Sequence, residues 1–182
     1  CIRNCCNCRS SFINLIDLDD TKVDIYLKNP WTFIYFKKNC NDNRVADWKI
    51  HVSSTISNHK KVFEIVASYC IENEINFKFV SDLQKFMEIN EKSARRVNHG
   101  KFMVLYPSEG NILSVLEDLY KKTTDFEGPY ILTDKPYKNS KILFYRYGEY
   151  YPIRKISERG ITETFIKNNE NELVQDKRVP YY

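Results

Sequence analysis

The stretch from residue 59 to residue 72 constrains the fold most, because it has the pattern of an amphipathic helix between two strand-like segments. Its apolar residues recur at the spacing that places them on one helical face; they are Val62, Ile65, Val66, Tyr69 and Cys70. Asn58 is of the residue type that caps helix N-termini. The segments 48–54 and 76–80 alternate apolar and polar residues, as strands with one buried face do. We therefore expect a helix that packs on a sheet.

The rest of the chain continues this alternation of strands and helices. Residues 23–38 are rich in aromatic and β-branched residues, and Pro30 divides them into two short strands. Further strands are expected at 101–106, 130–132 and 142–147, and further helices at 82–89 after Ser81 and beyond Ser108. The order predicts an α+β fold in which helices pack on a mixed or antiparallel sheet of about five strands.

Three regions differ in composition. Residues 1–22 are irregular and rich in cysteine, residues 23–154 form the expected domain, and residues 155–182 are a polar tail or a linker to a further domain. Hydrophobic residues make up 42% of the 182 residues and aromatic residues 14%, which is enough for a core. A net charge of +4 argues against a general nucleic-acid binder. No apolar run approaches the length of a membrane span, so we expect no membrane partner.

The cysteines lie at positions 1, 5, 6, 8, 40 and 70. A zinc site needs two ligand pairs separated by a loop, whereas Cys5 and Cys6 are adjacent and no second cluster follows. We therefore expect no metal site. Cys70 lies on the apolar helix face and is expected in the core. Free thiols without a secretory signal indicate a cytoplasmic protein.

A cation recurs at or beside each of four expected strands; these residues are Lys49, Lys78, Lys101 and Arg146. In the strand 48–54, alternation places Lys49 and His51 on the same face. Each lysine by itself is most often a side chain on a wet strand face. Four cations that converge, however, repel one another unless an anion such as a phosphate holds them.

Acid–base residues accompany these cations. A lysine at position 78, desolvated by Phe77 and Phe79 and crowded by other cations, would lose its proton readily and could take a carbon-bound proton. A histidinium at position 51 could protonate a leaving phosphate oxygen. The pattern contains no cluster of carboxylates or metal ligands for hydrolysis, so it favours β-elimination of phosphate. In the connector 90–100, the cations Lys92, Arg95 and Arg96 are equally consistent with a solvated loop.

Five segments, in this order, resemble the N-terminal lyase domain of class III lanthipeptide synthetases and, more distantly, of class IV. They are 48–55 (WKIHVSST), 76–79 (NFKF), 100–107 with GKF at its start and YP at its end, 128–132 (GPYIL) and 145–148 (YRYG). The set is specific, although no single segment is. The tail 171–180 (NELVQDKRVP) is similar to the segment that leads into the kinase domain of those enzymes. The K-x-H strand is shared with the bacterial phosphothreonine lyase effectors.

The resemblance implies a parent enzyme with lyase, Ser/Thr kinase and cyclase domains in one chain. The kinase, with ATP and Mg²⁺, would phosphorylate a precursor peptide, and the lyase would eliminate phosphate without a cofactor to give dehydroalanine or dehydrobutyrine. The substrate of this domain would then be the phosphorylated leader–core peptide.

By position in the motifs, each site residue has an expected role. His51 would be the general acid, Lys78 the general base, and Lys49 a stabiliser of the enolate-like intermediate or the phosphate. Lys101 and Arg146 would bind phosphate.

Other contributions stay open at this point. Arg95 or Arg96 would be additional phosphate ligands, and Tyr26 or Tyr35 could supply a tyrosine. The alternatives to a lyase are a phosphopeptide-binding module without catalysis and a nucleic-acid-binding domain. The His51–Lys78 pair favours the lyase, because a binding module needs cations but no paired acid and base.

Overall fold

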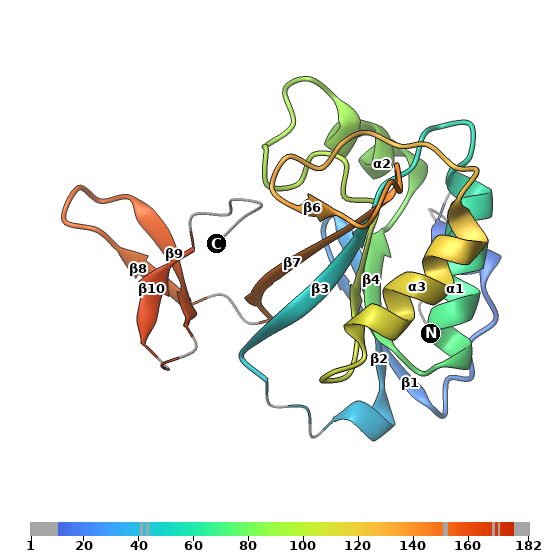
Figure 1. The fold of residues 1–182 in the computed structure, drawn as a ribbon, viewed down its shortest axis with the longest axis horizontal. Helices are drawn as coiled ribbons and strands as arrows, with labels where there is room; N and C mark the ends of the chain where they lie inside the picture. The colour runs from blue at the N-terminus through green and yellow to red at the C-terminus, as the bar shows by residue number, and fades with distance from the viewer. Residues whose placement is uncertain are drawn as a thin grey trace.

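The structure is a computed structural model that describes residues 11–40, 42, 44–150, 153–168, 170 and 172–176. The cysteine cluster of the N-terminus lies outside these residues. Two units of sheet are seen: a seven-stranded sheet with helices, and a three-stranded sheet near the C-terminus that lies beside it (Figure 1).

The seven-stranded sheet is antiparallel throughout and has the strand order β1-β2-β4-β5-β3-β7-β6. Its strands are β1 (Val23–Lys28), β2 (Trp31–Phe36), β3 (Ala46–Val52), β4 (Asn76–Val80), β5 (Met103–Tyr106), β6 (Lys135–Pro136) and β7 (Leu143–Glu149). The helices are α1 (His59–Glu72), α2 (Leu83–Asn90) and α3 (Ile112–Thr123), with 3₁₀ turns at Phe12–Leu15 and Lys37–Asn39. The α+β class is therefore confirmed, while the sheet has more strands than the expected five.

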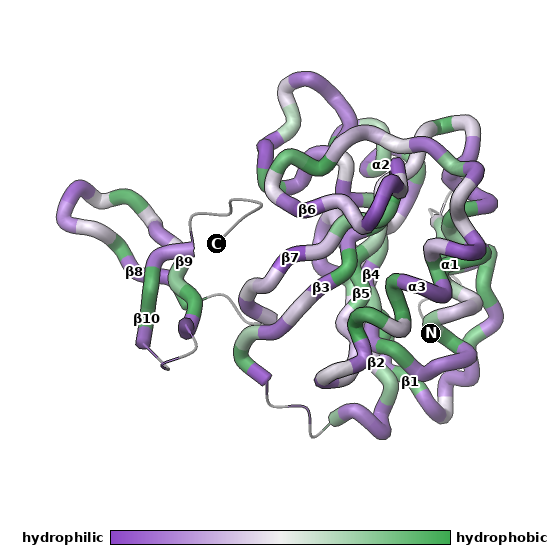
Figure 2. Tube along the Cα trace, viewed as in Figure 1, coloured by the Kyte–Doolittle hydropathy of each residue, from purple (hydrophilic) through white to green (hydrophobic). Residues whose placement is uncertain are grey.

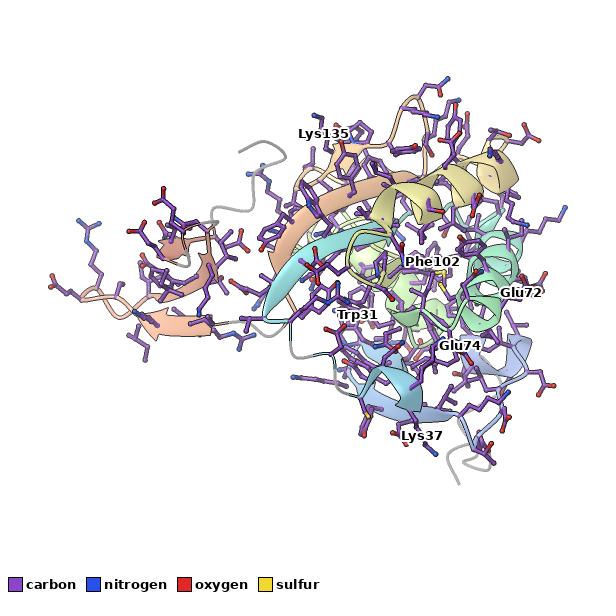
Figure 3. The ribbon with its side chains drawn as sticks, turned by 60° about the horizontal axis from the view of Figure 1, so that its bottom comes forward. Trp31, Lys37, Glu72, Glu74, Phe102 and Lys135 are labelled. Carbon is purple, nitrogen blue, oxygen red and sulfur yellow. The ribbon has the colours of Figure 1, made fainter. Side chains whose placement is uncertain are left out.

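The core lies between this sheet and the pair of helices α1 and α3, which cover the same face (Figure 1). Apolar segments of the tube gather where these elements meet (Figure 2). Phe63 of α1 packs against Phe79 of β4 with ring centroids 4.9 Å apart. Both side chains belong to the hydrophobic core. Phe102, labelled in Figure 3, is fully buried in the same layer. Cys70 lies in this core as expected, and burial raises the pKa of its thiol.

Helix α1 has the bounds expected from its spacing, but two other helix starts differ from the prediction. The N-cap of α2 is Asp82 rather than Ser81, because the Asp82 carboxylate accepts a hydrogen bond from the backbone N–H of Lys85 at 2.9 Å. Helix α3 begins after Asn111, a few residues beyond the expected Ser108. Serine, aspartate and asparagine are all common N-caps, so the sequence alone does not show which of several nearby candidates caps a helix.

Residues 130–132, expected as a strand, form no strand. This segment belongs to a loop that crosses the end of β3, where Gly128 lies against the backbone of Ser53 and Ser54. A Cβ at Gly128 would be 2.9 Å from Ser54 N, so only glycine fits. Close packing of this loop replaces strand pairing.

The expected polar tail contains the three strands β8 (Ile153–Ile156), β9 (Thr162–Lys167) and β10 (Leu173–Gln175). They form an antiparallel sheet in the order β10-β9-β8. Apolar residues are sparse in this sheet, but the side chain of Ile166 is buried, with 4% of it exposed. The sequence pattern predicted none of these three strands.

Candidate active site

The seven-stranded sheet has a second face, opposite α1 and α3, which we call the site face. In β3, Lys49 and His51 point to it, because Ile50 and Val52 are fully buried on the helix side. Arg146 of β7 lies opposite Lys49 in the antiparallel register and therefore shares its face. The structure thus brings these three predicted residues together.

Lys78 reaches the site face from β4. Its neighbours Phe77 and Phe79 are buried on the helix side. Val104 of β5 pairs with Lys78 on one side and with His51 on the other. Since adjacent strands are ~4.8 Å apart, the backbones of Lys78 and His51 are separated by roughly 10 Å across Val104. All three side chains face the same side of the sheet, with Val104 between the lysine and the histidine.

Asp134 joins the charged groups at one end of the site face. Its side chain is fully buried, and its carboxylate contacts His51 Nδ1, Lys101 Nζ at 3.3 Å and Arg146 Nε at 3.8 Å. The hydroxyl of Thr133 donates a further hydrogen bond to Asp134 at 2.6 Å. Asp134 lies in a turn, where its backbone N–H donates to the carbonyl of Ile131 at 3.2 Å. The expectation of a site without carboxylates was wrong.

These contacts set the protonation states at this end. Burial by itself would raise the pKa of Asp134, but the hydrogen bond from His51 and the charge of Lys101 outweigh it and hold that pKa below its usual range. Burial lowers the pKa of His51, and Lys101 and Arg146 lower it further against the opposing effect of Asp134. In the free protein His51 is therefore a neutral imidazole held at Nδ1 by Asp134, which leaves Nε2 for a ligand.

Lys49 also lies on the site face, beside Arg146 in the strand register. Its Nζ donates to the backbone carbonyl of Glu149 and lies 5.9 Å from the ring centroid of Tyr106 and 5.7 Å from that of Tyr150. Burial lowers the pKa of Lys49 to about 7, with a contribution from the nearby cations of Arg146, Lys78 and Lys101. The cations of three strands and one loop therefore converge around Lys49.

Lys78 lies over aromatic rings of the neighbouring strand β2. Its Nζ is 4.7 Å from the ring centroid of Trp31 and 5.1 Å from that of Phe33. The expectation that Phe77 and Phe79 desolvate this lysine was wrong, because successive residues of a strand face opposite sides. The rings that contact Lys78 are its neighbours across the strand pair.

The aromatic row continues toward the edge of the sheet. Tyr35 stacks on Phe33 with ring centroids 6.0 Å apart, and Tyr26 of β1 meets Tyr35 edge-on at 5.8 Å. Both tyrosines proposed from sequence therefore belong to one row with Phe33.

Arg95 and Arg96 are not brought into this cluster. They lie in the connector between α2 and β5, and their side chains are exposed. The structure gives neither side chain a contact with the described residues of the site face. Among the residues described, no group of three or more His, Cys, Asp or Glu side chains is placed to hold a metal ion.

Comparison with known proteins gives the family. Residues 21–182 match the family described as RamC, N-terminal domain. The chain belongs to the RamC N-terminal domain family. It is also similar to the "Probable SapB synthase" of Streptomyces coelicolor, with 29% identity over 136 residues that cover 74% of this chain and 14% of that protein. The chain therefore spans about a seventh of this curated relative's length. The resemblance drawn from the five segments is confirmed at the level of the family.

Solved structures of phosphothreonine lyase effectors share the fold. The VirA (SpvC) effector of Chromobacterium violaceum matches with a TM-score of 0.55 and 15% identity over 75% of this chain and 72% of that one. SpvC of Salmonella gives 0.55 and 14% identity over 75% of each chain. OspF of Shigella flexneri gives 0.51 and 15% identity over 75% of each chain. The chain thus has the phosphothreonine lyase fold. In the part of the chain that the structure describes, no helix is long and apolar enough to cross a membrane.

Proposed function

We propose that this domain eliminates phosphate from phosphoserine or phosphothreonine in a peptide, giving dehydroalanine or dehydrobutyrine. The observation that carries the proposal is the placement of Lys78 and His51 on either side of Val104, beside the cations Lys49, Lys101 and Arg146. A base and an acid on one face of the sheet, with cations beside them to bind phosphate, are what a β-elimination requires.

In the proposed reaction, the neutral amine of Lys78 removes the α-proton of the phosphorylated residue. The electron pair of the Cα–H bond forms the Cα=Cβ double bond, and the Cβ–Oγ bond breaks with its electrons leaving on the phosphate. His51 Nε2 gives its proton to the leaving oxygen. Lys49 stabilises the negative charge that develops as the α-proton leaves, and Lys101 and Arg146 bind the phosphate.

His51 must carry a second proton to act as the acid, although it is neutral in the free protein. A phosphate monoester brings a charge of about −1.5 to −2 into a buried site, and this charge favours the imidazolium. Asp134 holds Nδ1 and opposes the charge of the imidazolium, so substrate binding itself would protonate His51 at Nε2. The acid would therefore form only when the phosphate is present.

The surrounding enzyme is part of the proposal. By resemblance to class III lanthipeptide synthetases, the lyase would act in cis with a kinase that uses ATP and Mg²⁺ and with a cyclase, in the cytoplasm, on a leader–core precursor peptide. The elimination itself would need no cofactor. Residues 155–182 would connect the lyase to the kinase, and Arg95 or Arg96 would reach the phosphate only if the connector moves.

The deciding experiment is incubation of this chain with a phosphoserine peptide, followed by mass spectrometry. Loss of phosphoric acid is expected. Loss of the phosphoryl group alone would indicate a phosphatase, and binding without a mass change would indicate a phosphopeptide-binding module. Addition of a thiol to the product gives an independent check, because dehydroalanine reacts with thiols and serine does not.

A further inference from the structure

Arg146 meets a carboxylate that comes from the small C-terminal sheet. Its Nη1 donates to both oxygens of Asp176, at 3.0 Å and 3.2 Å. Both side chains are buried, with 8% of Arg146 and 1% of Asp176 exposed. Asp176 follows β10, and its backbone N–H donates to the carbonyl of Thr164 in β9 at 2.8 Å. The small sheet therefore holds this carboxylate against the site face.

This contact occupies the part of Arg146 that another anion would use. Arginine grips phosphate best through two parallel N–H bonds. In the structure Asp176 takes Nη1, while Nε faces the Asp134 carboxylate at 3.8 Å. Nη2 lies over Gly148, where a Cβ would be only 2.8 Å away. A bidentate grip on a substrate phosphate therefore requires that Asp176 release Nη1.

We propose that the Asp176 carboxylate occupies the position of the substrate's phosphate in the free protein, and that the C-terminal sheet is an intramolecular strap which a phosphate monoester displaces. This inference rests on the proposed phosphate-binding role of Arg146. Asp176 carries one negative charge and a phosphate monoester about 1.5 to 2, so the cluster of Lys49, Lys101 and Arg146 favours the phosphate. Without substrate, the carboxylate offsets the repulsion among these cations.

The first test measures the binding of inorganic phosphate to the 182-residue chain by isothermal titration. Asp176→Asn keeps the shape of the side chain and removes its charge, so it should bind phosphate about tenfold more tightly than the wild type. Glu163→Gln is the matched control, since it removes the same charge from β9 at a position paired in register with Lys155. We expect its affinity to stay within about twofold of the wild type.

The second test needs no variant. In the wild type, saturating phosphate should shift the NMR signal of the Asp176 carboxyl carbon, because the strap leaves Arg146. An unchanged signal would overturn the proposal. So would weaker phosphate binding by Asp176→Asn, which would show that Asp176 orients Arg146 instead of competing for it.

The strap and the lyase can fail separately. If Asp176→Asn binds phosphate more tightly but neither chain eliminates phosphate from a phosphopeptide, the strap stands and the proposed reaction is wrong. If both chains eliminate phosphate and their phosphate affinities are equal, the reaction stands and the strap is wrong.

Discussion

The two ends of the site face hold their cations in different ways. At one end, which we call the acidic end, Lys101 and Arg146 contact the buried carboxylate of Asp134. At the other, the aromatic end, Lys78 lies over the rings of Trp31 and Phe33. A carboxylate fixes both the position and the charge of its partner, whereas an aromatic face attracts the ammonium without neutralising it. The difference suits the acidic end to holding phosphate and the aromatic end to moving a proton.

The sharpest test of this division removes the acid or the base. Lys78→Ala and His51→Ala should each lower the rate of elimination by roughly 10²–10⁴-fold, because each removes a proton transfer. Single-turnover mass spectrometry of a phosphoserine peptide measures the rate. Added ethylamine should partly restore Lys78→Ala, since a free amine can replace the missing base.

Lys49→Ala is the control for that assignment. The pKa of Lys49 is lowered to about 7, so this lysine is the rival candidate for the base. We expect Lys49→Ala to be slower than the wild type and insensitive to ethylamine. If the amine restored Lys49→Ala and not Lys78→Ala, the roles of the two lysines would have to be exchanged.

At the acidic end, the largest expected effect is on stability. Asp134→Asn leaves Lys101 buried without the carboxylate it contacts and leaves Arg146 with Asp176 alone. It should lower the free energy of unfolding by about 3–5 kcal/mol. Urea denaturation measures this change. Asp125→Asn, an exposed carboxylate in the loop after α3, should stay within about 0.5 kcal/mol of the wild type. Equal effects of the two substitutions would mean that Asp134 does not organise this end.

The same end should make stability depend on pH. The pKa of His51 is lowered in the folded protein, so between that value and the ordinary histidine value of about 6.5 the unfolded chain binds more protons. The contribution of His51 is therefore complete above about pH 6.5 and is lost as the pH falls. The lowered pKa of Asp134 acts in the same direction below about pH 4.

Urea denaturation between pH 7 and pH 4.5 tests this dependence. His51→Gln should flatten the fall in unfolding free energy over that range. A slope that survives in His51→Gln would show that other groups cause it.

Much of this molecule could be predicted from local sequence. The periodicity of residues 59–72 predicted α1, and alternation around Lys49 and Lys78 placed both lysines on the site face. Alternation could not show which residues lie across a strand pair. For that reason Phe77 and Phe79, adjacent in sequence, were taken as the environment of Lys78, whereas β2 provides it.

The carboxylates were harder to foresee. Asp134 lies in a loop, and an aspartate near a proline has the ordinary pattern of a turn. Only the antiparallel pairing of β3 with β7 brings His51 and Arg146 to it. Asp176 follows a short strand in a region with few apolar residues, so no local pattern connects it with Arg146.

The smallest expected effect compares Phe33, which lies across the strand pair from Lys78, with Phe79, which follows Lys78 in the sequence. Phe33→Leu keeps an apolar side chain beside Lys78 and removes the aromatic face, so elimination should slow by about two- to fivefold. Phe79→Leu alters the fully buried ring next to Lys78 in sequence. It should lower the free energy of unfolding by about 1–2 kcal/mol and leave the rate of the folded protein unchanged. Rates measured well below the unfolding temperature decide between them. A slower reaction in Phe79→Leu alone would mean that the helix-side layer, and not β2, positions the lysine.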